Sequence, residues 1–258
     1  MEPRYTASHS AAAKRAAKSM AAPNQFTTTR WTLVLAAKRR DDPAGSEAFA
    51  RLCERYYEPM YAYLRRRGQT LEDAQDLTQG FIARLIEKDV LRHADPARGK
   101  FRAFLLTALK HYAANEHTRA TADKRGGSQR SLPLDLEAAE GRYGHEPRND
   151  LTPERLYDRR WALAVLERAL TAVRAECRAN GREAFLDAVH GSLTGEGDRA
   201  PYREIAERFG MTESSVRVTV HRMRLRYRDL VRAEVAQTVE SEEAVDEELR
   251  YLLSALGG

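Results

Sequence analysis

Five arginines and no acidic residue follow Glu213 in the stretch FGMTESSVRVTVHRMRLRYR, residues 209–228. Guanidinium groups bind phosphates and the edge of guanine, so this composition suits the binding of a polyanion rather than covalent chemistry. The apolar residues recur at helical spacing, at Val216, Val220, Met223 and Tyr227. The pattern predicts one helix with a buried stripe and basic flanks.

The residues just before this helix predict a helix-turn-helix. Pro201 suits the first position of a short helix over residues 202–209, Gly210 can end it in the left-handed conformation, and Thr212 can cap the next helix. In such a motif the first half of the second helix lies in the major groove of DNA. The candidate DNA-binding residues on its outward side are Ser214, Ser215, Arg217, Val218, His221 and Arg222.

The side chains of this helix suggest separate roles. Arg217 and Arg222 are suited to guanine, and Val218 to a thymine methyl group. The later arginines, 224 to 228, are expected to meet phosphates or another protein. The other interpretation of the same pattern is a surface helix with a solvated basic face.

Enzyme chemistry finds little support in the sequence. His145, His190 and Cys177 show no spacing of a nucleophile and a base, and there is no Gly-rich phosphate loop. Cys53 and Cys177 stand alone, which predicts neither a disulfide nor a metal site. We therefore expect no catalysis and no cofactor. No apolar run reaches membrane-spanning length and no secretory signal is present, so we expect a cytoplasmic protein without a membrane partner.

Helical periodicity without strand alternation predicts an all-α fold of two small helical domains joined by a flexible linker. The formal net charge of +5 favours a polyanionic partner. The predicted parts are a disordered N-terminus (1–25), a short helix (26–44), a first domain (45–121), a linker (122–152), a second domain with the helix-turn-helix (153–235) and an acidic amphipathic extension (236–258).

The first domain contains an acidic helix face in LEDAQDLTQGFIARLIEKDVL, residues 71–91. Its apolar residues share one side, and Asp73, Asp76, Gly80 and Glu87 lie on the other. Such a face repels DNA. Taken alone it is most simply a solvated surface.

The order of three segments gives this face another meaning. DAQDLTQ, then FRAFLLTALKHYAANEHTR, then a linker, then YREIAERFGMTESSVRVTVHRMRLRYRDL resembles the extracytoplasmic-function (ECF) group of the sigma-70 family of transcription initiation factors, over residues 45–235. The resemblance implies a factor that binds core RNA polymerase, at the beta-prime clamp helices and the beta flap, and brings it to promoter DNA. Asp73, Asp76 and Gln79 would then contact the polymerase.

The resemblance also divides the promoter between two regions. Region 2 would recognise and melt the downstream element through Lys110, His111, Asn115 and Arg119, and region 4, with the helix-turn-helix, would read the upstream element. Gly80 replaces an acid common in relatives. Phe104 and His111 stand where relatives often have Trp and Asn. The FTTTRWTLVLAA start and the VDEELRYLL end resemble a subgroup of planctomycete-type bacteria.

Two regulatory features remain open in the sequence. From Ala233 onward there are seven acidic residues and one arginine. This acidic helix either folds over the recognition helix and competes with DNA, or packs on region 4 to complete its core. Thr78 lies beside the polymerase motif and is a candidate phosphorylation site, so a regulatory kinase is one expected partner and an anti-sigma factor another.

A second function fits the helix-turn-helix alone. A stand-alone regulator would bind operator DNA as a dimer, and the DAQDLTQ segment would have no role in it. Whether DNA binding by the protein depends on core polymerase distinguishes the initiation factor from the stand-alone regulator.

Overall fold

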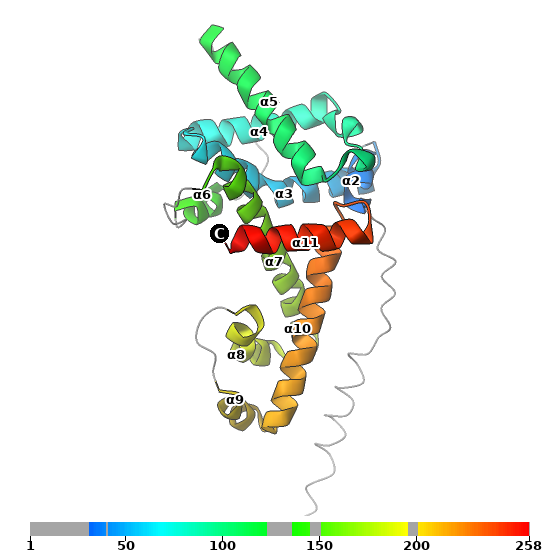
Figure 1. Ribbon diagram of the computed structural model, residues 1–258, viewed down its shortest axis with the longest axis vertical. Helices are drawn as coiled ribbons and strands as arrows, with labels where there is room; N and C mark the ends of the chain where they lie inside the picture. The colour runs from blue at the N-terminus through cyan, green and yellow to red at the C-terminus, as the bar shows by residue number, and fades with distance from the viewer. Residues whose placement is uncertain (1–30, 40, 123–135, 145–150, 196–200, 258) are drawn as a thin grey trace, which may run out of the picture.

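The computed structural model describes residues 31–39, 41–122, 136–144, 151–195 and 201–257 (Figure 1). Within these ranges the regular elements are all helices, which confirms the predicted all-α class. The elements are α2 (Thr32–Ala37), α3 (Pro43–Arg66), α4 (Leu71–Glu87), the 3-10 turns η1 (Val90–His93) and η2 (Pro96–Arg98), α5 (Phe101–Ala122), α6 (Leu136–Gly144), α7 (Pro153–Ala179), α8 (Glu183–Thr194), α9 (Tyr202–Phe209), α10 (Glu213–Ala236) and α11 (Glu242–Leu256).

Side-chain caps start several of these helices. The hydroxyl of Thr70 accepts a hydrogen bond from the backbone N–H of Asp73, at 3.1 Å. Thr152, Thr212 and Ser241 accept the equivalent bond at the starts of α7, α10 and α11. Each cap satisfies an N–H that the first turn of a helix leaves unpaired, so these starts are encoded locally.

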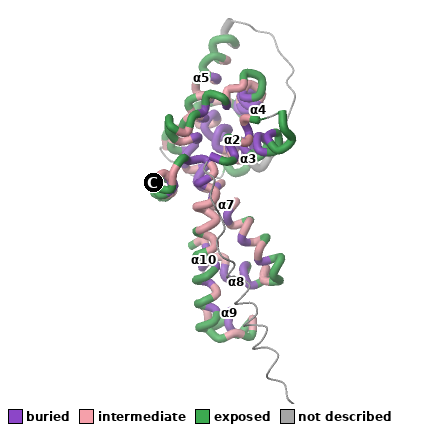
Figure 2. The backbone as a smooth tube through the Cα atoms, turned by 90° about the vertical axis from the view of Figure 1, so that its right-hand side faces the viewer, coloured by how far each residue is buried: buried purple, intermediate pink, exposed green. Residues whose placement is uncertain are grey.

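The helices enclose two separate apolar cores. The upper core in Figure 1 joins α2 to α6 with the first half of α7, the end of α10 and α11. The lower core joins the second half of α7 with α8, α9 and the first half of α10. Figure 2 shows α7 and α10 as the paired helices that connect the two buried regions.

The upper core includes segments that the sequence assigned to the linker and to the second domain. The first half of α7 buries Tyr157, Trp161 and Val165 among residues of the predicted first domain. Within the predicted linker, α6 packs on α3 and buries Ala139. The predicted disordered segment 1–25 lies outside the described residues.

The short helix predicted near the N-terminus is part of the upper core. Trp31 and Val34 are buried, and the Trp31 ring meets Phe101 edge-on at a centroid distance of 5.8 Å. The end of α2 approaches α3 at Gly45, where an added Cβ would lie 1.8 Å from the backbone oxygen of Arg39. A glycine is needed here because any side chain would push α2 away.

The substitution Gly45→Ala is therefore expected to destabilise the protein, by about 1–3 kcal/mol, because the clash is with backbone. Gly141→Ala is the matched control, since a Cβ on Gly141 in α6 would meet nothing within 4 Å. It should leave the free energy of unfolding unchanged or raise it by up to about 1 kcal/mol, through helix propensity. Urea denaturation of both variants measures the difference. Equal stability of the two variants would contradict the close approach.

Candidate functional site

The helix-turn-helix has the predicted geometry. Gly210 has a left-handed backbone (φ 61°), and Thr212 caps α10. Val216, Val220 and Met223 are buried against α8 and α9. The opposite face of α10 is therefore exposed at the lower end of the molecule (Figure 1), and it carries all six predicted DNA-binding residues: Ser214, Ser215, Arg217, Val218, His221 and Arg222.

Three of these six side chains have partners within the motif. The Ser214 hydroxyl lies 3.0 Å from the hydroxyl of Thr212. The Arg217 guanidinium lies 2.5 Å from Glu213, and both side chains are largely exposed. A surface pair of this kind contributes little, so a phosphate or base can replace Glu213. The Ser215 hydroxyl accepts a hydrogen bond from Thr212 at 2.8 Å, which places Ser215 in the helix cap.

The later arginines of α10 mostly bind this chain's own helices, which corrects the expectation that they meet phosphates or another protein. Arg224 donates to the backbone oxygen of Ser192 at the end of α8, at 2.9 and 2.6 Å. Arg226 lies 2.6 Å from Glu176 of α7. These contacts fasten α10 within its own lobe. Arg228 remains largely exposed.

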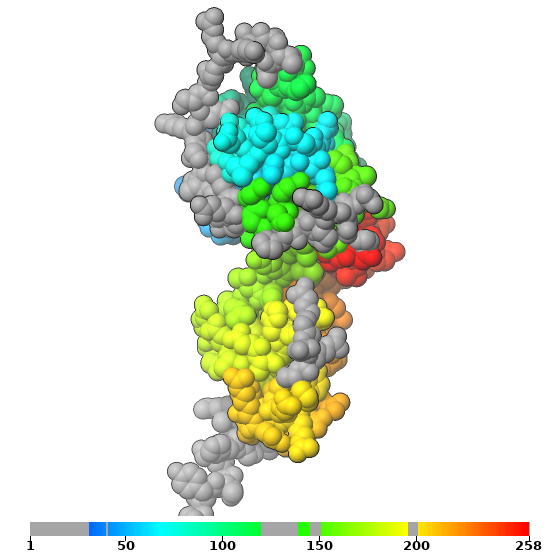
Figure 3. Space-filling model, turned by 90° about the vertical axis from the view of Figure 1, so that its left-hand side faces the viewer, coloured from blue at the N-terminus to red at the C-terminus, as the bar shows by residue number. Residues whose placement is uncertain are grey.

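The acidic face of α4 is only partly as predicted. Asp73 and Asp76 are exposed and Gln79 is half-buried, so the three predicted polymerase contacts lie on an accessible surface. Figure 3 shows a face of the molecule on which α4 is uncovered, in cyan. Asp73 also accepts a hydrogen bond from the Thr70 hydroxyl at 2.8 Å, so it closes the helix cap.

For two neighbouring residues, Gly80 and Thr78, the structure differs from what the sequence suggested. Gly80 is buried, not on the outward side. Thr78 is completely buried, and its hydroxyl donates to the backbone oxygen of Ala74 at 2.7 Å. A kinase cannot reach a hydroxyl in this position, so the prediction of a phosphorylation site at Thr78 is wrong for the folded protein.

Helix α5 projects beyond the body of the molecule in Figure 1. His111, Asn115 and Arg119 recur every four residues and are all exposed, so they form one stripe along the projecting part. Lys110 differs from these three, because it lies 2.7 Å from Glu154 in the first turn of α7. The hydrogen bond from Lys110 lowers the pKa of Glu154.

A buried cluster of charges at the start of α5 has no signal in the sequence. Arg102 binds Asp158 of α7 and Glu248 of α11, the latter at 2.9 Å. Lys100 lies 2.6 Å from the same Glu248. Tyr251 donates a hydrogen bond to Asp158 and places its ring 4.7 Å from the Arg102 guanidinium carbon.

The protonation states of the cluster follow from its contacts. Burial opposes the charge on Arg102, but Glu248 and Asp158 outweigh this effect and raise the pKa of Arg102. Burial and the hydrogen bond to Asp158 raise the pKa of Tyr251. Within the cluster Arg102 is therefore a cation and Tyr251 a neutral phenol.

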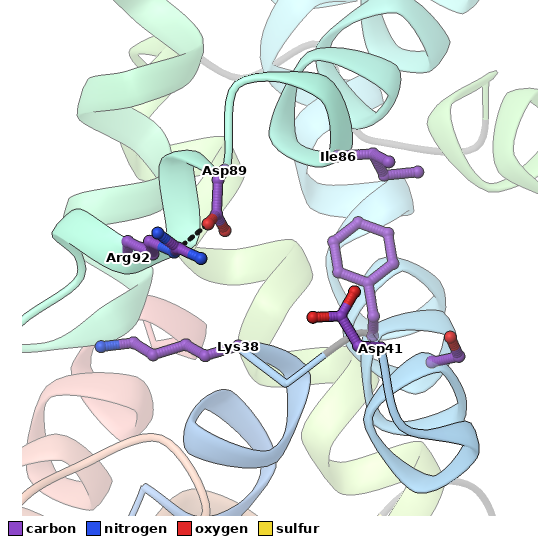
Figure 4. A pocket seen from close by; sticks show the side chains of 7 residues that line it. Lys38, Asp41, Ile86, Asp89 and Arg92 are labelled. Atoms are coloured by element: carbon purple, nitrogen blue, oxygen red, sulfur yellow. Dashed lines mark ion pairs between the residues drawn. The ribbon is translucent and has the colours of Figure 1, made fainter.

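An open pocket of about 450 Å³ lies beside α2, α3, α4 and η1 (Figure 4). Figure 4 shows the Arg92 side chain directed toward Asp89, with which it forms an ion pair, and Lys38 and Asp41 at the rim. The described residues include no group of three or more His, Cys, Asp or Glu side chains placed to hold a metal ion. They also include no helix long and apolar enough to cross a membrane.

Residues 52–122 match the family model of sigma-70 region 2. The matched segment runs from α3 to the end of α5, so it contains both the exposed acidic residues of α4 and the projecting stripe of α5. These residues are therefore similar to sigma-70 region 2, a domain of transcription initiation factors. No curated protein and no solved structure matches the chain.

Two arginines of α10 allow a test of whether the exposed face of this helix binds DNA, independently of any effect on stability. Arg222→Ala removes an exposed outward side chain, and we expect the complex with core polymerase to lose about tenfold in affinity for duplex DNA selected from a random pool, with the unfolding midpoint unchanged. Arg226→Ala is the matched variant. It should lower the free energy of unfolding by less than about 1 kcal/mol, because its partner Glu176 is partly exposed. If the Arg222→Ala variant kept the wild-type affinity for DNA, the exposed face of α10 would be excluded as the DNA-binding surface.

Proposed function

We propose that the protein is a sigma factor of the ECF group, which binds core RNA polymerase and directs it to specific promoters. The observation that carries the proposal is the presence of a sigma-70 region 2 and an exposed helix-turn-helix in one chain. The projecting α5 and the recognition helix α10 lie at opposite ends of the molecule in Figure 1. Two DNA-facing surfaces so placed suit a promoter with two separated elements.

Polymerase binding is assigned to α4. Asp73, Asp76 and Gln79 present two carboxylates and an amide on the exposed side of a helix whose other side is buried in the upper core. An acidic surface on a protein of net charge +5 cannot attract DNA and suits a basic protein partner. We assign the beta-prime clamp helices to this surface and the beta flap to the helix-turn-helix lobe.

Recognition of the downstream element is assigned to α5. Melted bases are recognised by stacking and by hydrogen bonds to their edges, while cations hold the backbone. His111 and Asn115 can contact base edges, and Arg119 and Lys110 can contact phosphates. Because His111, Asn115 and Arg119 are exposed on the projecting part of α5, a strand can reach them without moving other helices. The factor acts by binding energy alone.

Recognition of the upstream element is assigned to the first half of α10. Ser214 and Arg217 lie in its first turns, and Val218, His221 and Arg222 continue the same exposed surface. Val218 is half exposed, at 50%, on the same surface. Contact with a thymine methyl group gives this exposed side chain a role.

The finer assignments remain proposals. The ECF group is supported by the two-part arrangement of region 2 and helix-turn-helix, and the planctomycete-type subgroup by the two ends of the sequence. We further propose a cytoplasmic location. An anti-sigma factor or a kinase as partner stays a prediction. Thr27 to Thr29 and Thr32 are further candidate phosphorylation sites; Thr32 is exposed, and Thr27 to Thr29 lie outside the described residues.

Reconstitution with core polymerase tests the function directly. Core enzyme plus this protein should initiate at a defined set of sites in genomic DNA, which sequencing of the transcripts would identify. The protein without core should bind these sites far more weakly. Tight binding to paired half-sites as a dimer without core, together with no gain in initiation, would instead establish a stand-alone regulator.

The acidic face of α4 gives a sharper test. Asp76→Ala should weaken binding to core polymerase by about tenfold or more, because an exposed charge at an interface is lost while the fold is untouched. Glu47→Ala is the control, since Glu47 is an exposed acid on α3 that pairs with Arg51 one turn away in the same helix. Fluorescence titration with labelled protein measures both. Equal affinities of the two variants would exclude α4 as the contact.

A further inference from the structure

Arg217, on the exposed face of α10, contacts two other side chains of the helix-turn-helix. Its guanidinium carbon lies over the ring of Tyr202 in α9, 5.6 Å from the ring centroid. Its Nη2 atom lies 2.5 Å from the carboxylate of Glu213, one turn earlier in α10. The Arg217 side chain is nevertheless 64% exposed. The guanidinium is therefore held by two neighbours and still open to a ligand.

The two contacts of Arg217 differ in how firmly they are anchored. Tyr202 is the first residue of α9, is partly buried and packs against the lower core. Helix α9 contacts α10, and both lie at the lower end of the molecule in Figure 1. Glu213 is exposed, and an ion pair at the surface contributes little and is screened by salt. A ligand can thus displace the carboxylate of Glu213 while the ring of Tyr202 stays in place.

Arg222 shows what an arginine on this face looks like without such support. It is exposed, and it makes no ring contact and no ion pair with the residues that the structure describes. A bidentate contact with guanine requires the planar guanidinium in one orientation, and a long side chain loses conformational entropy when it is fixed. The DNA itself must orient Arg222, whereas the orientation of Arg217 is restricted before DNA binds.

We propose that Tyr202 is a positioning residue for DNA recognition, whose ring holds the Arg217 guanidinium in the orientation of a bidentate contact with guanine. The O6 and N7 acceptors of the guanine then replace the carboxylate oxygens of Glu213. Because the side chain is oriented beforehand, less conformational entropy is lost on binding. The inference rests on the proposed function and deepens the recognition of the upstream element that is assigned to α10.

The expected effect of losing the ring is on the choice of base. An arginine without this support still reaches the phosphates beside it, and phosphate contacts carry no sequence information. The free energy of a cation resting on an exposed aromatic ring corresponds to about two- to fivefold in an equilibrium constant. Removal of the ring should therefore reduce the preference for guanine at one position by this factor and leave the other positions unchanged.

Replacements of Tyr202 separate the ring from the packing. Tyr202→Phe keeps the ring, and Tyr202→Leu keeps an apolar side chain against the lower core without a ring. Each variant, bound to core polymerase, selects duplex DNA from a random pool, and sequencing of the bound DNA gives the base preference at each position. We expect Tyr202→Phe to select like the wild type, and Tyr202→Leu to lose about two- to fivefold of the guanine preference at one position.

Phe209→Leu is the matched control. Phe209 is also a partly buried ring of α9 with an arginine over it, since the Arg208 guanidinium carbon lies 5.3 Å from its centroid. Arg208 belongs to α9 and not to the recognition helix. Phe209→Leu should therefore keep the wild-type base preference. An unchanged guanine preference in Tyr202→Leu, or an equal loss in both leucine variants, would overturn the proposal.

A measurement on the free protein separates failure of this inference from failure of the proposed function. Protons above an aromatic ring resonate upfield, so the δ-methylene protons of Arg217 should be shifted upfield in the wild type and in Tyr202→Phe, but not in Tyr202→Leu. The same chemical shifts in all three proteins would overturn the contact, whatever the protein binds. A wild-type protein that shows the shift but selects no DNA together with core polymerase would instead refute the proposed function.

Discussion

The structure depends on the packing of the first half of α7 into the upper core. Tyr157, Trp161 and Val165 are almost fully buried there, against α3 and α5. Side chains of this kind contribute roughly 1.5–3 kcal/mol each on burial, far more than an exposed ion pair at about 0–1 kcal/mol. The apolar contacts therefore hold the two lobes together. The second half of α7 continues directly into the lower core, so the position of the helix-turn-helix follows from this one helix.

Ion pairs around α7 fix its orientation relative to α3 and α10. Glu234 of α10 lies 2.9 Å from both Arg55 of α3 and Arg168 of α7, and Glu58 of α3 pairs with Arg160 at 3.2 Å. Apolar surfaces tolerate small rotations, but partly buried ion pairs leave an unpaired charge when the helix turns. An interface held by apolar burial and aligned by charge thus has one preferred register.

The sequence predicted what is encoded locally and missed what depends on distant partners. The cap at Thr212, the turn at Gly210 and the buried stripe of α10 follow from spacing within a few residues, and all three are present. Pairs such as Arg102 with Glu248 join positions 146 residues apart, and neither residue is unusual where it stands. Charge runs alone likewise could not show that Arg224 and Arg226 bind this chain's own helices.

The fate of the arginines in α10 also explains how one helix can serve both fold and recognition. Exposed residues of its first half face away from the lobe, whereas Arg224, Arg226 and Arg232 bind α8, α7 and α11 in succession. A recognition helix needs a fixed orientation, because base contacts are lost when the helix rotates by a fraction of a turn. Arg224, Arg226 and Arg232 fix this orientation through their contacts along the second half of the helix. Positive charge in this segment is thus divided by partner: Arg217 and Arg222 lie on the exposed face of the first half, whereas Arg224, Arg226 and Arg232 bind neighbouring helices.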